Sequence, residues 1–345
     1  MNLIVTGGYG FIGSNFIHYY LNKHPNDQIL NIDCKTYAGW PKNLEGINWS
    51  RCKCREWDIS CLISNMALAI SWADAIIHFA AESHVDRSIT GPSKFMETNI
   101  MGTFNLLELV RTLKPTIRFL YVSTDEVYGE LPLEGKEMFT EQTPLDPHSP
   151  YSVSKTAADL LCQAYHRTYG LNTIVTRCCN NYGPFQFPEK LIPVAIFKAL
   201  DGKKIPVYGQ GLNVRDWIYV EDHCSALDLL LHKSPPGEVW NIGSNYPISN
   251  INLVKIILRL LKKDPENRIE FVTDRLGHDL KYAIDATKLL TAFLEWRPKH
   301  TLFKGLEKTI KWYQEHRTWW KKIESYDDLS ETGYEGQAAL ISGGD

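Results

Sequence analysis

A tyrosine and a lysine four residues apart, Tyr151 and Lys155, have a spacing that could support proton transfer. They follow Pro150 at the start of a helix-like segment, and a spacing of four places both side chains on one helix face. A lysine ammonium beside a phenol favours the phenolate and lowers the tyrosine pKa toward the working range. The phenolate can then take a proton from a hydroxyl while hydride leaves the same carbon. A solvated pair on a surface helix is the alternative interpretation.

An acidic pair, Asp125 and Glu126, follows Ser123 and Thr124 at the end of an apolar run. Functional side chains in parallel sheets gather at the carboxyl ends of strands. Thr124 can hydrogen-bond a hydroxyl that becomes a carbonyl. Adjacent carboxylates repel, so one tends to stay protonated and can donate to a leaving hydroxyl while the other abstracts an acidified C–H proton. The alternative is a helix N-cap followed by first-turn acids.

Three glycines, Gly7, Gly10 and Gly13, follow the first apolar run and precede a helix-like segment. The first permits a tight turn, the second lets a pyrophosphate approach the backbone, and the third lets the helix pack on the strand. Asp33 ends the second apolar run, where a carboxylate accepts hydrogen bonds from adenosine ribose hydroxyls and repels a 2′-phosphate. The pattern predicts an NAD site rather than an NADP site. A turn-capping role for Asp33 is the alternative.

The elements that must position these groups alternate along the first half of the chain. Short apolar runs suited to buried strands lie at 3–6, 29–33, 75–80, 119–124 and 173–177, with helical patterns near 11–23, 92–112 and 150–169. This alternation predicts an α/β fold with a doubly wound parallel sheet of Rossmann type. Further on, helices are expected near 189–200, 249–262 and 303–316, and another strand at 239–242.

We expect two domains and a tail. The NAD-binding Rossmann domain is predicted to comprise 1–178 and about 214–244. A smaller C-terminal α/β domain, formed by about 179–213 and 245–325, is predicted to bind the substrate. Residues 326–345 are acidic and rich in glycine, and we expect a flexible tail.

Composition excludes several classes of protein. The 345 residues carry a formal charge of −3, which offers no electrostatic footprint for nucleic acid. No apolar run reaches the length of a membrane helix. The eight cysteines lack a second pair at zinc-site spacing, so we predict no metal site. With no secretory leader, reduced thiols and a cytoplasmic location are expected.

Several separate stretches together resemble the dTDP-glucose 4,6-dehydratases of the extended short-chain dehydrogenase/reductase superfamily. The resemblance runs from residue 1 to about 323. Its most specific motif is the Asp-Glu pair after Thr124, which related 4-epimerases generally lack. The matching stretches are Thr6–Ser14, His78–Ser88, Ser123–Gly129, Ser149–Lys155, Arg177–Pro184, Pro188–Pro193, Asn213–Trp217 and Asp274–Asp279.

The resemblance implies a mechanism with five catalytic residues. Tyr151, helped by Lys155 and Thr124, would deprotonate the glucose 4-hydroxyl while the C4 hydride passes to NAD. Glu126 would then remove the C5 proton, and Asp125 would protonate the C6 hydroxyl as water leaves. Hydride would return to C6, so that NAD is regenerated in each cycle and stays tightly bound.

Binding residues follow from the resemblance by position. The implied cofactor-binding residues are Gly7, Gly10, Phe11, Ile12, Gly13, Asp33, Lys35, Thr36, Asp58, Ile59, Ala80, Ala81, Thr98, Tyr151, Lys155 and Asn181. The implied sugar-nucleotide-binding residues are Ser83, His84, Thr124, Asn180, Glu189, Lys190, Leu191, Pro206, Val207, Tyr208, Arg215, Asn250, Arg275 and His278. Two stretches depart from the family pattern, Trp40-Pro41 and Leu280-Lys281, the latter where two arginines are usual.

Three other functions stay open. The same chemistry could act on UDP-glucose, since one methyl group on the base is worth only ~1–3 kcal/mol of discrimination. A sugar-nucleotide 4-epimerase would need no water loss, and the Asp125-Glu126 pair argues against it. A non-catalytic NAD-binding regulator would bind NAD without turnover. The resemblance also implies a homodimer, formed by helices near 98–112 and 151–169.

Overall fold

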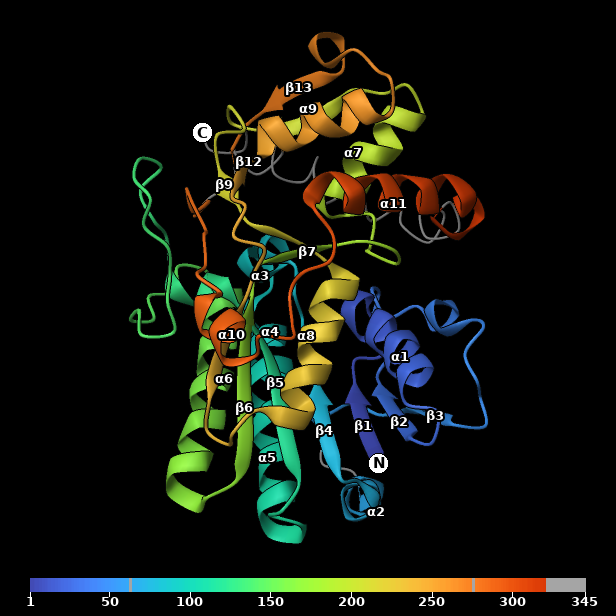
Figure 1. The fold of residues 1–345 in the computed structure, drawn as a ribbon, viewed down its shortest axis with the longest axis vertical. Helices are drawn as coiled ribbons and strands as arrows, with labels where there is room; N and C mark the ends of the chain where they lie inside the picture. Colours follow the sequence, from blue (N-terminus) through green and yellow to red (C-terminus); the bar gives the residue numbers. More distant parts are fainter. Residues whose placement is uncertain (62–63, 275–276, 321–345) are drawn as a thin grey trace, which may run out of the picture.

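The centre of the molecule is a seven-stranded parallel sheet (Figure 1), seen in a computed structural model that describes residues 1–61, 64–274 and 277–320. The strand order β11-β6-β5-β4-β1-β2-β3 reverses between β1 and β4, where sheets of this kind hold their ligands. The predicted doubly wound parallel sheet is confirmed. Its strands are β1 (Asn2–Thr6), β2 (Gln28–Asp33), β3 (Cys52–Glu56), β4 (Ala75–His78), β5 (Arg118–Thr124), β6 (Asn172–Cys178) and β11 (Val239–Ile242).

Helices cover both faces of this sheet, which is why its central strands β1, β4 and β5 are largely buried and apolar. Neighbouring residues of β1 point to opposite faces, so that Leu3 and Val5 join one core and Ile4 joins the other. The first core is covered by α1 (Phe11–Lys23), α8 (Val220–Lys233) and α10 (Thr287–Ala292). The second is covered by α2 (Ser64–Trp72), α5 (Gly102–Leu113) and α6 (Pro150–Tyr169).

A second lobe lies beyond the end of the sheet at which β6 leads into β7 (Figure 1). It has its own apolar core, built around residues such as Ile196, Val207 and Leu306. Three two-stranded pairings position its loops: β7 (Asn180–Tyr182) with β10 (Trp217–Tyr219), β8 (Ile205–Tyr208) with β13 (Ile269–Val272), and β9 (Val214–Arg215) with β12 (Ile248–Ser249). The helices of this lobe are α7 (Leu191–Leu200), α9 (Asn250–Leu260) and α11 (Leu302–Glu315).

Short helical segments connect the main elements. The segment predicted as one helix near 92–112 is α4 (Pro92–Phe95), a π-helical turn η2 (Met96–Met101) and then α5. The others are η1 (Pro41–Leu44), α3 (Val85–Thr90), η3 (Asp125–Tyr128) and η4 (Pro265–Asn267).

The division of the chain into a dinucleotide unit and a substrate unit remains our proposal. Residues such as Tyr282, Leu289 and Trp296 pack in the same core as α1 and α8. We therefore propose adding the segment around 282–296 to the dinucleotide unit. The predicted tail, 326–345, lies outside the described residues.

One buried ion pair fastens α6 to the sheet. Arg177 of β6 binds both carboxylate oxygens of Asp159 in α6, with Nε–Oδ2 at 2.8 Å and Nη2–Oδ1 at 3.1 Å. Both side chains are buried.

We expect Arg177→Met to lower the free energy of unfolding by about 3–5 kcal/mol, because it leaves the Asp159 carboxylate buried and uncompensated. Urea unfolding measures the change. The double variant Asp159→Leu/Arg177→Met should recover most of the loss, and a single variant as stable as the unmodified chain would contradict the argument.

Candidate active site

The glycine loop lies between β1 and the N-terminus of α1. Gly7 has φ +72°, a backbone conformation that favours glycine, and a Cβ there would lie 2.7 Å from the Ala80 nitrogen. A Cβ on Gly13 would lie 2.3 Å from the Gly7 carbonyl oxygen, so only glycine allows this close packing of helix on strand. Gly10 is the N-cap of α1, without a side-chain cap or a first-turn acid, which leaves the first N–H groups of α1 for an anion.

The close packing at Gly13 gives a test of the loop. Because an added Cβ would meet backbone, Gly13→Ala must displace the loop, and we expect it to weaken binding of the predicted cofactor NAD. Displacements of this kind cost on the order of tenfold to a hundredfold. Titration calorimetry with NAD measures the affinity. Gly91→Ala is the matched control, since its Cβ would lie 3.7 Å from the nearest atom. An unchanged affinity in Gly13→Ala would contradict this account of the loop.

Asp33 ends β2 beside this loop. Its Oδ2 accepts the Tyr9 N–H at 2.9 Å and its Oδ1 accepts the Lys35 N–H at 2.8 Å. Burial raises the pKa of this carboxyl, and the two N–H groups oppose that effect. The carboxylate therefore caps the turn after β2, as the alternative interpretation held. Each oxygen retains acceptor capacity for a ribose hydroxyl, so both roles are compatible.

The other residues predicted to bind the cofactor share one location, the carboxyl ends of the sheet strands. Each follows the last residue of a strand or lies on a helix beside that edge. They are Lys35 and Thr36 after β2, Asp58 and Ile59 after β3, Ala80 and Ala81 after β4, Phe11 and Ile12 in α1, and Thr98 in η2. Their role in cofactor binding stays a prediction.

Asn181 is the predicted cofactor residue whose side chain is most engaged by the protein itself. Its amide donates to the Cys179 carbonyl at 3.0 Å, and its Oδ1 lies 2.8 Å from Nδ1 of the buried His223. The amide therefore has a structural role in the loop after β6.

Tyr151 and Lys155 lie in the first two turns of α6, which a reciprocal Ser149–Ser152 capping box begins. Both side chains are buried. The Lys155 ammonium donates to the Val122 carbonyl at 2.7 Å, and burial lowers its pKa to about 8. The structure thus holds the lysine against the end of β5.

The pKa of Tyr151 differs from the sequence expectation. Burial raises it well above the ordinary value, the Glu126 carboxylate raises it further, and a hydrogen bond with Thr124 opposes both effects. Lys155 was expected to lower this pKa, but its ammonium binds a backbone carbonyl instead. The phenol therefore stays protonated in the site before cofactor and substrate bind.

The acid pair opens η3 directly after β5. Thr124 is the N-cap, and its hydroxyl accepts the Glu126 N–H at 3.3 Å. The alternative interpretation, a helix N-cap followed by first-turn acids, is therefore confirmed, and the catalytic roles stay a prediction. Asp125 is buried, and among the described residues its Oδ2 has no hydrogen-bond partner. Burial and the neighbouring Glu126 raise its pKa well above the ordinary carboxyl value, so Asp125 can hold a proton beside an ionised neighbour.

A cavity of about 170 Å³ opens beside Glu126, between the sheet and the second lobe. It collects residues that are far apart in the sequence. Twelve predicted substrate residues line it: Ser83, His84, Asn180, Glu189, Lys190, Leu191, Pro206, Val207, Tyr208, Arg215, Asn250 and His278. Thr124 is not part of the lining but adjoins it through Asp125 and Glu126, and Arg275 lies outside the described residues.

Charged side chains of the cavity are held by specific partners. The Arg215 guanidinium donates to the Asp279 carbonyl at 2.9 Å and lies 4.1 Å from the Tyr282 ring centroid. Glu189 accepts the Tyr37 hydroxyl at 3.1 Å. Among the described residues, the side-chain oxygens of Asn180 and Asn250 are buried without partners. These unsatisfied acceptors suit a ligand rich in hydroxyl and N–H groups.

Sequence reasoning missed six residues of the cavity wall. They are Val85, Asp86, Gln186, Val194, Trp217 and Tyr282. Val85, Asp86 and Trp217 lie inside motifs quoted for the resemblance, where their neighbours were chosen instead. Tyr282 had no sequence signal, because its place depends on how the segment after Asp279 returns to the cavity.

The fold and this site define a Rossmann-type dinucleotide-binding protein. Besides the glycine loop for the dinucleotide, it has a cavity for another ligand at the strand ends. The family model described as GDP-mannose 4,6 dehydratase matches residues 4–309. A dTDP-glucose 4,6-dehydratase of Escherichia coli is 48% identical, with 94% of this chain and 96% of that protein covered.

Two solved structures are similar to this chain in both sequence and fold. The dTDP-glucose 4,6-dehydratase of Bacillus anthracis in complex with NAD has 47% identity and a TM-score of 0.86, covering 94% of this chain and 99% of that one. The enzyme DesIV of Streptomyces venezuelae, with NAD and TYD bound, has 43% identity and a TM-score of 0.87, covering 94% and 100%. The chain belongs to the dTDP-glucose 4,6-dehydratase family.

Proposed function

We propose that this chain catalyses the NAD-dependent dehydration of dTDP-glucose to dTDP-4-keto-6-deoxyglucose and water. The observation that carries the proposal is the acid pair at the end of β5: Asp125 is buried, and Glu126 lines the cavity and lies near the Tyr151 phenol. Relatives that share 43–48% of the sequence carry this activity in their names.

The glycine loop, the open N-terminus of α1 and Asp33 fit a dinucleotide, with the phosphates at Gly10 and the adenosine ribose at Asp33. When bound, NAD would accept hydride from C4, return it to C6, and add a positive charge that offsets the carboxylates of the site. The glycine loop and the N-terminus of α1 would therefore position the phosphates of the cofactor, and Asp33 would select against a 2′-phosphate.

The side chains of the site then divide the proton transfers among them. The positive charge of bound NAD would favour the Tyr151 phenolate against the nearby carboxylates, and this phenolate, with Thr124 beside it, takes the proton of the 4-hydroxyl as C4 is oxidised. The resulting carbonyl acidifies the C5 proton, which Glu126 removes, while Asp125 gives its proton to the departing C6 hydroxyl. Asp125 suits this step because burial and Glu126 both raise its pKa. Glu126 would return its proton to C5 as hydride is added at C6, and proton exchange with solvent would then reset Tyr151 and Asp125 for the next cycle.

Product analysis tests the proposal. The purified chain is incubated separately with dTDP-glucose and UDP-glucose, and the products are examined by mass spectrometry and chromatography. Loss of one water from dTDP-glucose, absent in Asp125→Asn/Glu126→Gln, is the expected result. Water loss from UDP-glucose and not from dTDP-glucose would support the same mechanism with uracil as the preferred base. A galacto isomer of unchanged mass would identify an epimerase, and NAD binding without any product would identify a regulator.

We also propose a homodimer formed through α5 and α6. Five large apolar side chains are exposed on these helices and the residue before α5: Met101, Leu113, Val153, Leu160 and Tyr169. Exposed apolar side chains gathered on two neighbouring helices mark an interaction surface. Light scattering after chromatography should give a dimer mass, and Leu160→Asp should convert it to a monomer mass.

A cytoplasmic location is proposed as well. Its support is the eight cysteines, which are all free thiols in the structure. No helix among the described residues combines the length and the apolar character needed to cross a membrane.

A further inference from the structure

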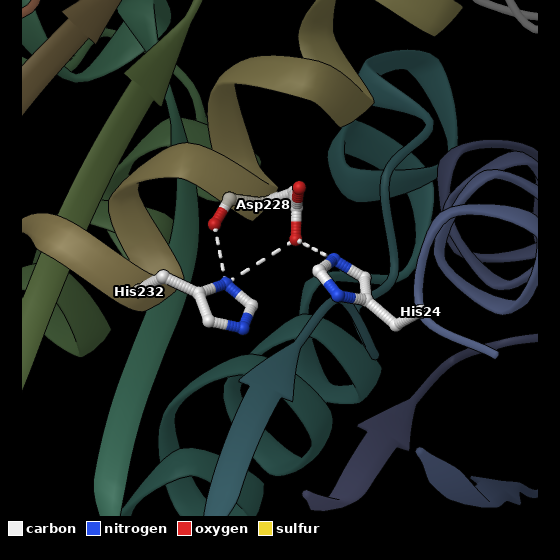
Figure 2. A group of neighbouring side chains, drawn as sticks. All are labelled: His24, Asp228 and His232. Atoms are coloured by element: carbon white, nitrogen blue, oxygen red, sulfur yellow. Dashed lines mark hydrogen bonds and ion pairs between the residues drawn. The ribbon is translucent and has the colours of Figure 1, made fainter. Parts of the chain in front are cut away.

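A cluster of two histidines and an aspartate lies where the C-terminal ends of α1 and α8 meet (Figure 2), and none of the three lines the cavity. His24 is the C-cap of α1, and Asp228 and His232 lie one turn apart in α8. Both imidazole rings turn toward the same carboxylate (Figure 2). Nothing in the proposed dehydration uses these residues.

The ligand atoms of the cluster already have nearly the spacing of a coordination sphere. Nε2 of His24 lies 2.8 Å, and Nδ1 of His232 lies 3.3 Å, from Oδ1 of Asp228. One ligand atom from each residue falls within 4.8 Å of the others. Tetrahedral bonds of zinc-ligand length place neighbouring ligand atoms about 3.3 Å apart. Small side-chain rotations therefore suffice to bring all three onto one ion.

Burial and the nearby helix ends favour cation binding by these three side chains. The carboxylate of Asp228 is buried, while the two imidazoles are partly exposed and leave a route to solvent. The C-terminal ends of two helices converge here, and such ends carry partial negative charge that favours a cation. Nδ1 of His232 lies 2.9 Å from the Asp228 carbonyl, so a turn of the ring could present Nε2 instead with Nδ1–H still held.

We propose that His24, Asp228 and His232 form a binding site for a late first-row divalent cation, with Zn²⁺ as the occupant. Two imidazoles and one carboxylate suit Zn²⁺, Co²⁺ or Ni²⁺, whereas Mg²⁺ and Ca²⁺ prefer oxygen ligands alone. Water would complete the coordination. Cysteine spacing predicted no metal site, and none of these three ligands is a cysteine.

Lys23 would compete with such an ion for the Asp228 carboxylate. Its ammonium binds the other carboxylate oxygen of Asp228 at 2.7 Å, and its side chain is half exposed. A bound cation must share the carboxylate with this positive charge or displace it. Removal of the lysine charge should therefore tighten metal binding, an effect that a purely structural histidine cluster would not produce.

Isothermal titration of the untagged full chain with Zn²⁺ tests the proposal, after dialysis against a chelator. We expect saturable binding of one equivalent, weakened about tenfold or more in His24→Gln and in His232→Gln. Lys23→Gln should bind more tightly. His316→Gln is the matched control, because His316 makes the same Nδ1 contact to the carbonyl four residues earlier, at 2.8 Å, but stacks on Trp312 instead of facing a carboxylate.

Co²⁺ absorption provides the second measurement. Coordination by nitrogen and oxygen gives visible bands without the strong near-ultraviolet charge transfer of a cobalt–thiolate bond, which separates this site from the free cysteines. Far-ultraviolet circular dichroism confirms that each variant is folded. Absence of saturable binding, or equal affinity in the unmodified chain and both histidine variants, would overturn the proposal. Unchanged binding in Lys23→Gln would overturn the role assigned to the lysine.

Discussion

Tyr151→Phe is expected to lower kcat for dTDP-glucose dehydration by about 10²–10⁴-fold, because it removes the group that takes the 4-hydroxyl proton. The phenol is buried beside Thr124 and Glu126. NAD affinity should change little, since the glycine loop and Asp33 are untouched. Steady-state kinetics and NAD titration of the same sample separate the two effects.

Tyr165→Phe is the control for this variant. Tyr165 lies on the same helix, and its hydroxyl contacts Glu108 at 2.7 Å, away from the cavity. It should keep nearly full activity. A Tyr151→Phe protein as active as the control would remove the tyrosine from the reaction and leave Glu126 as the base to examine for both deprotonations.

Asp125→Asn should stop the reaction after its first step. An asparagine cannot donate the proton that the leaving C6 hydroxyl needs, so product formation should fall by about 10²–10⁴-fold. Oxidation at C4 depends on Tyr151 and should persist. We therefore expect the absorbance of reduced nicotinamide to appear in a single turnover and to stay, as stopped-flow measurement would record.

The exposed Asp146, which lies in the connection between η3 and α6, gives the matched control Asp146→Asn. It should show no accumulation of reduced cofactor and normal product. If Asp125→Asn also failed to accumulate reduced nicotinamide, the aspartate would act in the oxidation step or in substrate binding, and the assignment of the leaving-group acid would be wrong.

Much of the sheet follows from local pattern, because strands buried on both faces read as uninterrupted apolar runs. The helix predicted near 11–23 is α1, and the helix predicted near 150–169 is α6. Strand β3 was not predicted, since its sequence Cys-Lys-Cys-Arg-Glu has three charged, exposed residues and only one buried residue, Cys52, at a sheet edge. Helix α8 was also missed, although the segment around it was assigned to the dinucleotide unit.

The site was predictable where its residues form compact motifs and unpredictable where contacts span the chain. The pKa of Tyr151 was expected to be lowered and is raised instead, because burial and the nearness of the Glu126 carboxylate depend on the folded site. Tyr282 joins the cavity through a returning segment, and His24 meets Asp228 across a separation of 204 residues. No spacing rule connects positions so far apart.

The strand order has a consequence for how the chain is made. Synthesis produces the glycine loop, the acid pair and the Tyr-Lys pair before β11, yet β6 pairs with β11 on its outer side. In a nascent chain that has reached only Cys178, β6 therefore has an unpaired edge, the kind of surface with which other strands can pair. A ribosome that stalls before Ile242 would release every motif of the dinucleotide site in a form that needs chaperone protection. That edge is covered once β11, which ends at Ile242, pairs with β6.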